Sequence, residues 1–176
     1  MRVLLEGISK KWNLIYITQK VKGEIMDVLC TKSATELAEL IRKKETSSKE
    51  VVEAHLNRIS EINPDLNAIT LTLEESALET AEKADNASEE DRKKPFHGVP
   101  FTIKENIDFK GTPTTQGVPL LAESMPTRNA PIVDRMMEAG AIPIGRTNLP
   151  EMAFRLDTDN PLRGRTFNPW NKELTP

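Results

Sequence analysis

The 176-residue sequence is poor in thiol and imidazole groups, with one cysteine, Cys30, and two histidines, His55 and His97. A single cysteine cannot form a disulfide within the chain, and these three residues have none of the close spacings typical of zinc ligands. We therefore expect no metal, no cofactor and a reducing, cytoplasmic compartment. No histidine lies near Cys30 in the sequence, which argues against a cysteine nucleophile.

The sequence also lacks an excess of one charge and any long apolar run. It has 24 Lys and Arg residues against 27 Asp and Glu residues, a formal net charge of -3. Without a concentrated basic patch, nothing in the composition indicates contact with nucleic acid. The apolar stretches 3–5 and 12–17 are short and are separated by Lys10 and Lys11. We expect neither a membrane span nor a cleaved leader.

Helix-start patterns are abundant in the first half of the chain. A Ser or Thr followed three residues later by Glu forms a capping box, which satisfies free N–H groups at the start of a helix. The second of these helices carries an apolar stripe, in which His55 is expected to pack, and should end at Asn63-Pro64. The three boxes are Ser33 with Glu36, Ser47 with Glu50, and Thr72 with Glu75.

Structure of a different kind is expected after the charged stretch 85–94, which reads as a solvated connection. Residues 101–103 form a short apolar run between Gly and Pro residues and predict a buried strand. A helix over 130–139, with an inner side formed by Ile132, Val133, Met136 and Met137, is followed by Gly140 as a C-terminal cap. Residues 141–145 predict a second strand. The order strand, helix, strand suggests a crossover within one sheet.

Lys104 is the first candidate for chemistry, because it stands where the strand 101–103 opens into a loop. A lysine in isolation is most often a solvated charge. Burial without an anionic partner disfavours the ammonium form, and this can make a lysine a base near neutral pH. Two interpretations of Lys104 therefore stay open at this point: a solvated charge at a strand end, or a desolvated general base.

The surroundings of Lys104 resemble the amidase signature family, serine hydrolases that cleave carbon–nitrogen amide bonds with a Ser-cisSer-Lys triad. The resemblance extends over residues 31–176 and includes fatty-acid-amide-hydrolase-like and indoleacetamide-hydrolase-like amidases and the A-type subunit of the glutamyl-tRNA amidotransferase. The segments that carry it are Gly98-Val99-Pro100, Ile103-Lys104-Glu105-Asn106, Gly111-Thr112-Pro113-Thr114-Thr115, Ala139-Gly140-Ala141-Ile142, Gly145-Arg146-Thr147-Asn148 with Glu151, Asn160-Pro161, Gly164-Arg165-Thr166 and Asn168-Pro169-Trp170.

The resemblance implies that Lys104 is the catalytic lysine of the triad and that the substrate is a small-molecule amide. In the family, the pair seen here as Thr175-Pro176 is followed by a Gly-Gly-Ser-Ser-Gly-Gly segment with the cis-serine, and the nucleophilic serine comes later. Neither serine loop is in the sequence, so we expect the chain alone to be inactive. Phe154 matches the region that lines the acyl pocket in lipid-amide members. Thr114, Thr115, Asn148 and Glu151 are polar residues near strand ends, for which structural roles are an equal alternative.

The implied fold is α/β: N-terminal helices followed by the first part of a mixed-sheet, helix-covered fold, which is incomplete here. We divide the chain into an extension of unknown structure (1–30), a helical region (31–95) and a first α/β part (96–176) that stops before the serine loops. The oligomeric state stays open, and so do two alternatives: a glutaminase subunit of an amidotransferase, or a non-catalytic, partner-binding product. A kinase-like strand lysine is excluded, because no glycine-rich phosphate loop precedes Lys104 and no His-Arg-Asp segment follows it.

Overall fold

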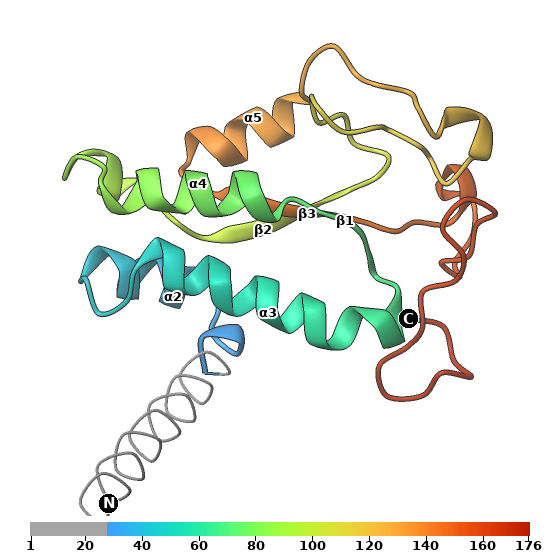
Figure 1. Ribbon diagram of the computed structural model, residues 1–176, viewed down its shortest axis with the longest axis horizontal. Coiled ribbons are helices and arrows are strands. Elements are labelled where there is room, and N and C mark those ends of the chain that lie inside the picture. The colour runs from blue at the N-terminus through green and yellow to red at the C-terminus, as the bar shows by residue number, and fades with distance from the viewer. Residues whose placement is uncertain (1–27) are drawn as a thin grey trace, which may run out of the picture.

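The computed structural model describes residues 28–176, so the expected extension 1–30 lies almost entirely outside the described part. The fold is a small mixed sheet with helices on both sides (Figure 1). The helices and strands are α2 (Ala34–Arg42), α3 (Ser48–Leu66), β1 (Ile69–Thr72), α4 (Glu74–Asp85), β2 (Pro100–Lys104), α5 (Pro131–Glu138) and β3 (Ile142–Thr147), with short 3-10 turns η1 (Asp91–Lys93), η2 (Pro119–Leu121) and η3 (Glu151–Ala153). The expectation of an α/β fold with a mixed sheet is confirmed.

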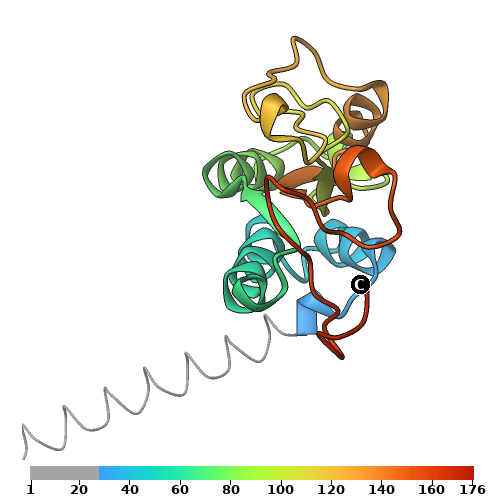
Figure 2. The ribbon, with the colours of Figure 1, turned by 90° about the vertical axis from the view of Figure 1, so that its right-hand side faces the viewer.

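The sheet has the strand order β1-β3-β2. β3 is parallel to β2 and antiparallel to β1. The crossover predicted from the sequence is present, since α5 connects the parallel strands β2 and β3. α5 lies on one side of the sheet, and α2 and α3 lie on the other (Figures 1 and 2).

The first two capping boxes are confirmed. The side chains of Ser33 and Ser47 accept from the backbone N–H groups of Glu36 and Glu50, and each glutamate side chain accepts from the backbone of its serine in return. The predicted end of α3 at Asn63-Pro64 is wrong, because the helix continues through Pro64 to Leu66. Proline removes only the bond to the carbonyl four residues earlier, and that residue, Ser60, is exposed to water.

The third capping box is wrong. Thr72 belongs to β1, and α4 begins after Leu73 without a side-chain cap. β1 was not expected at all, and it pairs with β3, so the sheet contains a strand from the stretch expected to be helical. A strand of four residues is too short for a clear alternation of apolar and polar side chains.

The core consists of two apolar clusters that join the helices to the sheet. The first joins α2 and α3 to the segment before β2, and its buried members are Leu29, Leu37, Ala38, Ile41, Val51, Ala54 and Val99. The second joins α3, α4 and β3, and its buried members are Val52, Leu56, Ala77, Ala81, Ile142 and Ile144. Ile142 and Ile144 thus pack the central strand β3 against α3 and α4.

The inner side expected for α5 is only partly confirmed. Val133 is buried, but Ile132 and Met137 are 57% and 39% exposed. The edge strand β2 leaves room beside α5, where a shallow apolar hollow is lined by Phe101, Ile103, Ile107, Ile132, Val133 and Met136 among others. The C-terminal cap is confirmed, since Gly140 follows α5 with φ of 92°.

Candidate active site

Lys104 is the last residue of β2 and lies at the carboxyl end of the parallel pair β2 and β3. The strand end predicted from the sequence is therefore confirmed. A desolvated Lys104 is not found within residues 28–176, because its side chain is exposed there. Figure 2 looks onto this end of the sheet, where the loops after β2 and β3 lie next to each other. Gln116 and Met152 join these loops, through a 2.8 Å backbone hydrogen bond.

Glu105, directly after Lys104, is a fully buried carboxylate at 1% exposure. Its Oε1 accepts a 2.6 Å hydrogen bond from the Thr70 hydroxyl and lies 2.9 Å from Nη2 of Arg163. Its Oε2 accepts from the Thr115 hydroxyl and, at 3.3 Å, from Nε of Arg163. The carboxylate thus joins β1, the end of β2 and two loops.

These contacts decide the charge of Glu105. Burial alone raises the pKa of the carboxyl, but hydrogen bonds from Thr115, Thr70 and Arg163, together with the charge of Arg163, bring the pKa below its ordinary value. Glu105 is therefore ionised, and its oxygens are already occupied. Among residues 28–176 no carboxylate forms an ion pair with Lys104, so its amine has no anionic partner there.

A second buried polar network follows β3 and centres on Asn148. Its Nδ2 donates to the Gly164 carbonyl and to the Thr166 hydroxyl, both at 3.0 Å, and its Oδ1 accepts from Nδ2 of Asn160 at 2.7 Å. Thr166 donates in turn to the carbonyl of Asn67, the left-handed cap of α3. The network holds the loop after β3 against the end of α3.

The polar candidates named from the sequence divide between these networks. Thr115 is in the Glu105 network and Asn148 centres the second one, so both have the structural roles that were the alternative to catalysis. Thr114 has a buried hydroxyl without a partner in the described structure. Glu151 is partly buried in η3, and its backbone carbonyl accepts from Phe154.

Phe154 lies just after η3, in the loop that follows β3, and is 85% exposed. A role in the core of the described residues is therefore excluded. The backbone before it is unusual, since Met152 and Ala153 have φ of 53° and 59°, a region that side chains with a Cβ seldom adopt. Phe154 thus projects from a constrained loop on the same end of the sheet as Lys104.

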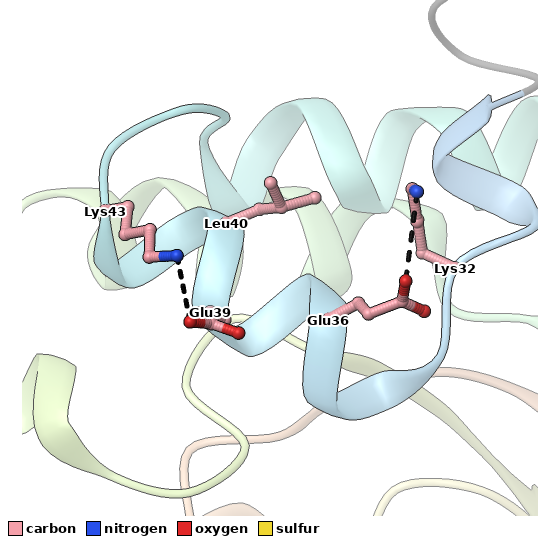
Figure 3. A pocket seen from close by; sticks show the side chains of 5 residues that line it. All are labelled: Lys32, Glu36, Glu39, Leu40 and Lys43. Atoms are coloured by element: carbon pink, nitrogen blue, oxygen red, sulfur yellow. Dashed lines mark ion pairs between the residues drawn. The ribbon is translucent and has the colours of Figure 1, made fainter.

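A hollow beside α2 is lined by Lys32, Glu36, Glu39, Leu40 and Lys43 (Figure 3). Its charged side chains pair with each other, Lys43 with Glu39 at 2.9 Å and Lys32 with Glu36 at 3.8 Å. Such exposed pairs one helical turn apart are ordinary surface features. Within the described residues, no group of His, Cys, Asp and Glu side chains has an arrangement that would hold a metal ion. No helix in this part of the chain has the length and apolar character needed to cross a membrane.

Comparison with known proteins connects these features to one family. Residues 50–176 match the family model described as Amidase. The chain belongs to the amidase family. This confirms the resemblance first seen around Lys104, Arg146 and Asn160.

Three similar proteins represent the groups expected from the sequence. The indoleacetamide hydrolase of Bradyrhizobium diazoefficiens is 45% identical over 144 residues, which cover 81% of this chain and 28% of that protein. The A-type subunit of the glutamyl-tRNA(Gln) amidotransferase from Caldanaerobacter subterraneus is 37% identical over 141 residues, 80% of this chain and 29% of that protein. A solved fatty acid amide hydrolase superimposes with a TM-score of 0.78 at 30% identity, covering 84% of this chain and 26% of that one. The chain thus spans under a third of the length of these amidase-family proteins.

The structure also shows functional candidates that the sequence did not single out. Glu105 and Arg146 lie in the segments that carry the family resemblance but were given no role, and Arg163 lies outside those segments. A signal was available for two of them, since Glu105 directly follows an apolar strand and Arg146 is a charge inside one. A charge in such a position needs a partner, whereas nothing in the sequence identified Arg163 as that partner.

Proposed function

We propose that this chain supplies the general base of a carbon–nitrogen amide hydrolase, with Lys104 as the lysine of a Ser-cisSer-Lys triad. The two serines come from polypeptide outside the 176 residues, so the chain alone hydrolyses no amide. Residues 31–95 and 96–176 act as the helical and the first α/β part of the amidase domain. The similarity to an indoleacetamide hydrolase and to a fatty acid amide hydrolase supports the proposed class of reaction.

One observation carries the proposal: the carboxylate next to Lys104 is occupied elsewhere. An adjacent free glutamate would hold the lysine as an ammonium ion, because an opposite charge favours the charged form. Glu105 is instead buried and engaged by Arg163, Thr70 and Thr115. Lys104 lies at the carboxyl end of the parallel pair β2 and β3, where α/β folds commonly bind ligands, and no carboxylate within residues 28–176 pairs with its amine.

The proposed chemistry needs Lys104 in its neutral form, which requires removal of the amine from water as well as the absence of an anionic partner. A neutral Lys104 accepts a proton, through the cis-serine, from the nucleophilic serine as that serine attacks the amide carbonyl carbon. The carbon–nitrogen bond breaks, an acyl-enzyme forms, and the lysine ammonium helps to protonate the leaving amine. The polypeptide that carries the serines would also cover Lys104 and provide the desolvation that residues 28–176 do not.

Phe154 has a place in the same proposal. Its exposed ring lies on the end of the sheet where Lys104 lies, which suits a residue that lines an acyl pocket after the remaining polypeptide covers it. An amidotransferase glutaminase would use the same lysine, and no feature of the described residues favours it over a simple amidase. A non-catalytic role also stays open to the experiment below.

The experiment is a chimera. Residues 31–176 of this chain replace the matching N-terminal part of the indoleacetamide hydrolase from Bradyrhizobium diazoefficiens, which keeps its own later segments. We expect the chimera to hydrolyse indoleacetamide and the 176-residue chain to show no turnover with the same substrate or with an aryl amide. Turnover by the chain alone would contradict the proposal. A folded chimera without activity would favour the non-catalytic role.

A further inference from the structure

A buried guanidinium lies beneath the turn that follows Lys104. Arg146, in β3, has no exposed surface. Its Nη2 donates to the Lys104 carbonyl at 3.3 Å and to the Ile107 carbonyl at 2.9 Å, and its Nη1 donates to the Thr112 hydroxyl at 2.9 Å. The Ile107 N–H closes the turn by donating to the Lys104 carbonyl at 2.9 Å. Arg146 thus binds both ends of the turn and the loop beyond it.

We propose that Arg146 is a positioning residue for the amidase chemistry, which fixes the turn from which the Lys104 side chain leaves β2. This inference rests on the proposed function of Lys104. It concerns how the base is held and adds no group that touches the substrate.

The peptide group between Lys104 and Glu105 is held at both of its polar atoms. Its C=O accepts from Arg146 and from the Ile107 N–H, and its N–H donates to the Thr147 carbonyl at 3.0 Å. A peptide group is planar, so fixing both atoms fixes its rotation about the backbone. That rotation sets the direction of the Lys104 side chain relative to the sheet.

Arg146 acts through the backbone rather than through the lysine side chain. In the register of the parallel pair, Arg146 lies opposite Ile103, and Thr147 lies opposite Lys104. Successive side chains in a strand point to opposite faces, so Ile103 and Lys104 leave β2 on different sides. The guanidinium therefore reaches the carbonyl of Lys104 and leaves the amine available to the serines.

An arginine suits these contacts. Its planar fork presents five N–H donors in fixed directions, which suits two carbonyls and a hydroxyl at once. Burial lowers the pKa of the guanidinium, while Glu105 and Asp108 oppose that change. Nε has no partner among the described residues. An apolar side chain would avoid the cost of a buried charge but would donate no hydrogen bonds to the Lys104 and Ile107 carbonyls.

The test uses the chimera defined above with three variants. Arg146→Met keeps the length of the side chain and removes its donors, Arg146→Lys keeps the charge, and Arg135→Met makes the same change at an exposed position of α5. A misplaced base costs about 100-fold in rate, so we expect Arg146→Met to lower kcat about 100-fold with KM within about threefold. Arg146→Lys should recover about tenfold of that loss, and Arg135→Met should change neither constant. A kcat within threefold of the parent for Arg146→Met, or a loss explained by the unfolded fraction, would overturn the inference.

A second measurement is independent of activity. In the 176-residue chain, NMR follows the Lys104 side-chain resonances and the exchange rate of the Ile107 amide. We expect Arg146→Met to shift the Lys104 resonances and to raise the exchange rate of the Ile107 amide at least about tenfold. The exchange rate of the Val51 amide in α3 should not change. Unchanged Lys104 resonances and an unchanged Ile107 exchange rate would overturn the inference. If Arg146→Met does not fold, Thr112→Val replaces it, because this change removes one acceptor of the guanidinium. Thr112→Val should lower kcat of the chimera about fivefold. A kcat equal to that of the parent chimera would count against the positioning role of Arg146. An inactive parent chimera would refute the function of Lys104, whereas the NMR result would still decide the role of Arg146.

Discussion

The Glu105 carboxylate should contribute more to stability than any exposed charge in the chain. Glu105→Gln keeps the shape of the side chain and removes its charge, leaving the Arg163 guanidinium against a neutral amide. Removing one partner of a buried ion pair costs about 3–5 kcal/mol. Arg163 is 28% exposed and can be partly hydrated, so we take the lower end, about 3 kcal/mol.

The assay is thermal and urea unfolding of the 176-residue chain, followed by circular dichroism. For a domain of this size about 1 kcal/mol changes the Tm by roughly 2–4 °C, so Glu105→Gln should lower it by roughly 6–12 °C. Glu123→Gln makes the same chemical change at an exposed loop position and should leave the Tm within about 1 °C. A Tm change below about 2 °C for Glu105→Gln would refute the reasoning.

A double-mutant cycle identifies the partner. If the pair with Arg163 carries the effect, Glu105→Gln should cost about 1–2 kcal/mol less when Arg163→Met is already present. Equal costs in both backgrounds would mean that the hydroxyls of Thr70 and Thr115, rather than the ion pair, carry the stabilisation. The cycle thus separates the two sets of contacts made by one carboxylate.

Three further outcomes can be measured on the same chain. Burial lowers the pKa of His97, although its hydrogen bond to the Ala84 carbonyl opposes this, so the unfolded chain binds the proton more readily than the folded chain. The free energy of unfolding should therefore fall as the pH drops below about 6.5, and it should fall less steeply in His97→Gln. Parallel plots of this free energy against pH, from pH 7.5 to 5.5, for the parent and the variant would count against this. Gly98→Ala places a Cβ 2.3 Å from the Ser48 hydroxyl at φ of 76° and should lower the free energy of unfolding by about 3 kcal/mol. Gly111→Ala, with φ of 91° and no atom within 4 Å of the new Cβ, should lower it by about 1 kcal/mol. Equal losses would contradict the packing around Gly98. Asn148→Ala leaves several buried polar groups unpaired and should lower the urea midpoint by an amount equivalent to about 2–4 kcal/mol, and an unchanged midpoint would show that the loop after β3 is held otherwise.

The parts of the fold that depend on local rules could be predicted from the sequence. The boxes at Ser33 and Ser47, the glycine cap at Gly140 and the strand ending at Lys104 each need only a few neighbouring residues. The errors have the opposite character. β1 exists because β3 provides its hydrogen-bond partners, a contact between residues more than 70 positions apart, and it uses Thr72, which would otherwise have capped a helix.

The site divides in the same way. Lys104 could be proposed from the apolar run before it and from the matched segments around it, but its exposure could not, because that depends on which polypeptide covers β2. Nor could the partners of Glu105, since Thr70, Thr115 and Arg163 approach it from three separate segments. A sequence shows that a charge follows a buried strand; only the fold shows what neutralises it.

The central claim is that Lys104 is the base, and one comparison in the chimera tests it most directly. Lys104→Ala removes the amine at the end of β2, and Lys110→Ala removes the amine of another exposed lysine in the loop that follows β2. We measure kcat/KM for indoleacetamide with both variants. The proposed role predicts a fall of at least about 100-fold for Lys104→Ala, the lower bound for losing a general base, and no change for Lys110→Ala. A Lys104→Ala chimera that keeps its parent's kcat/KM would contradict the account.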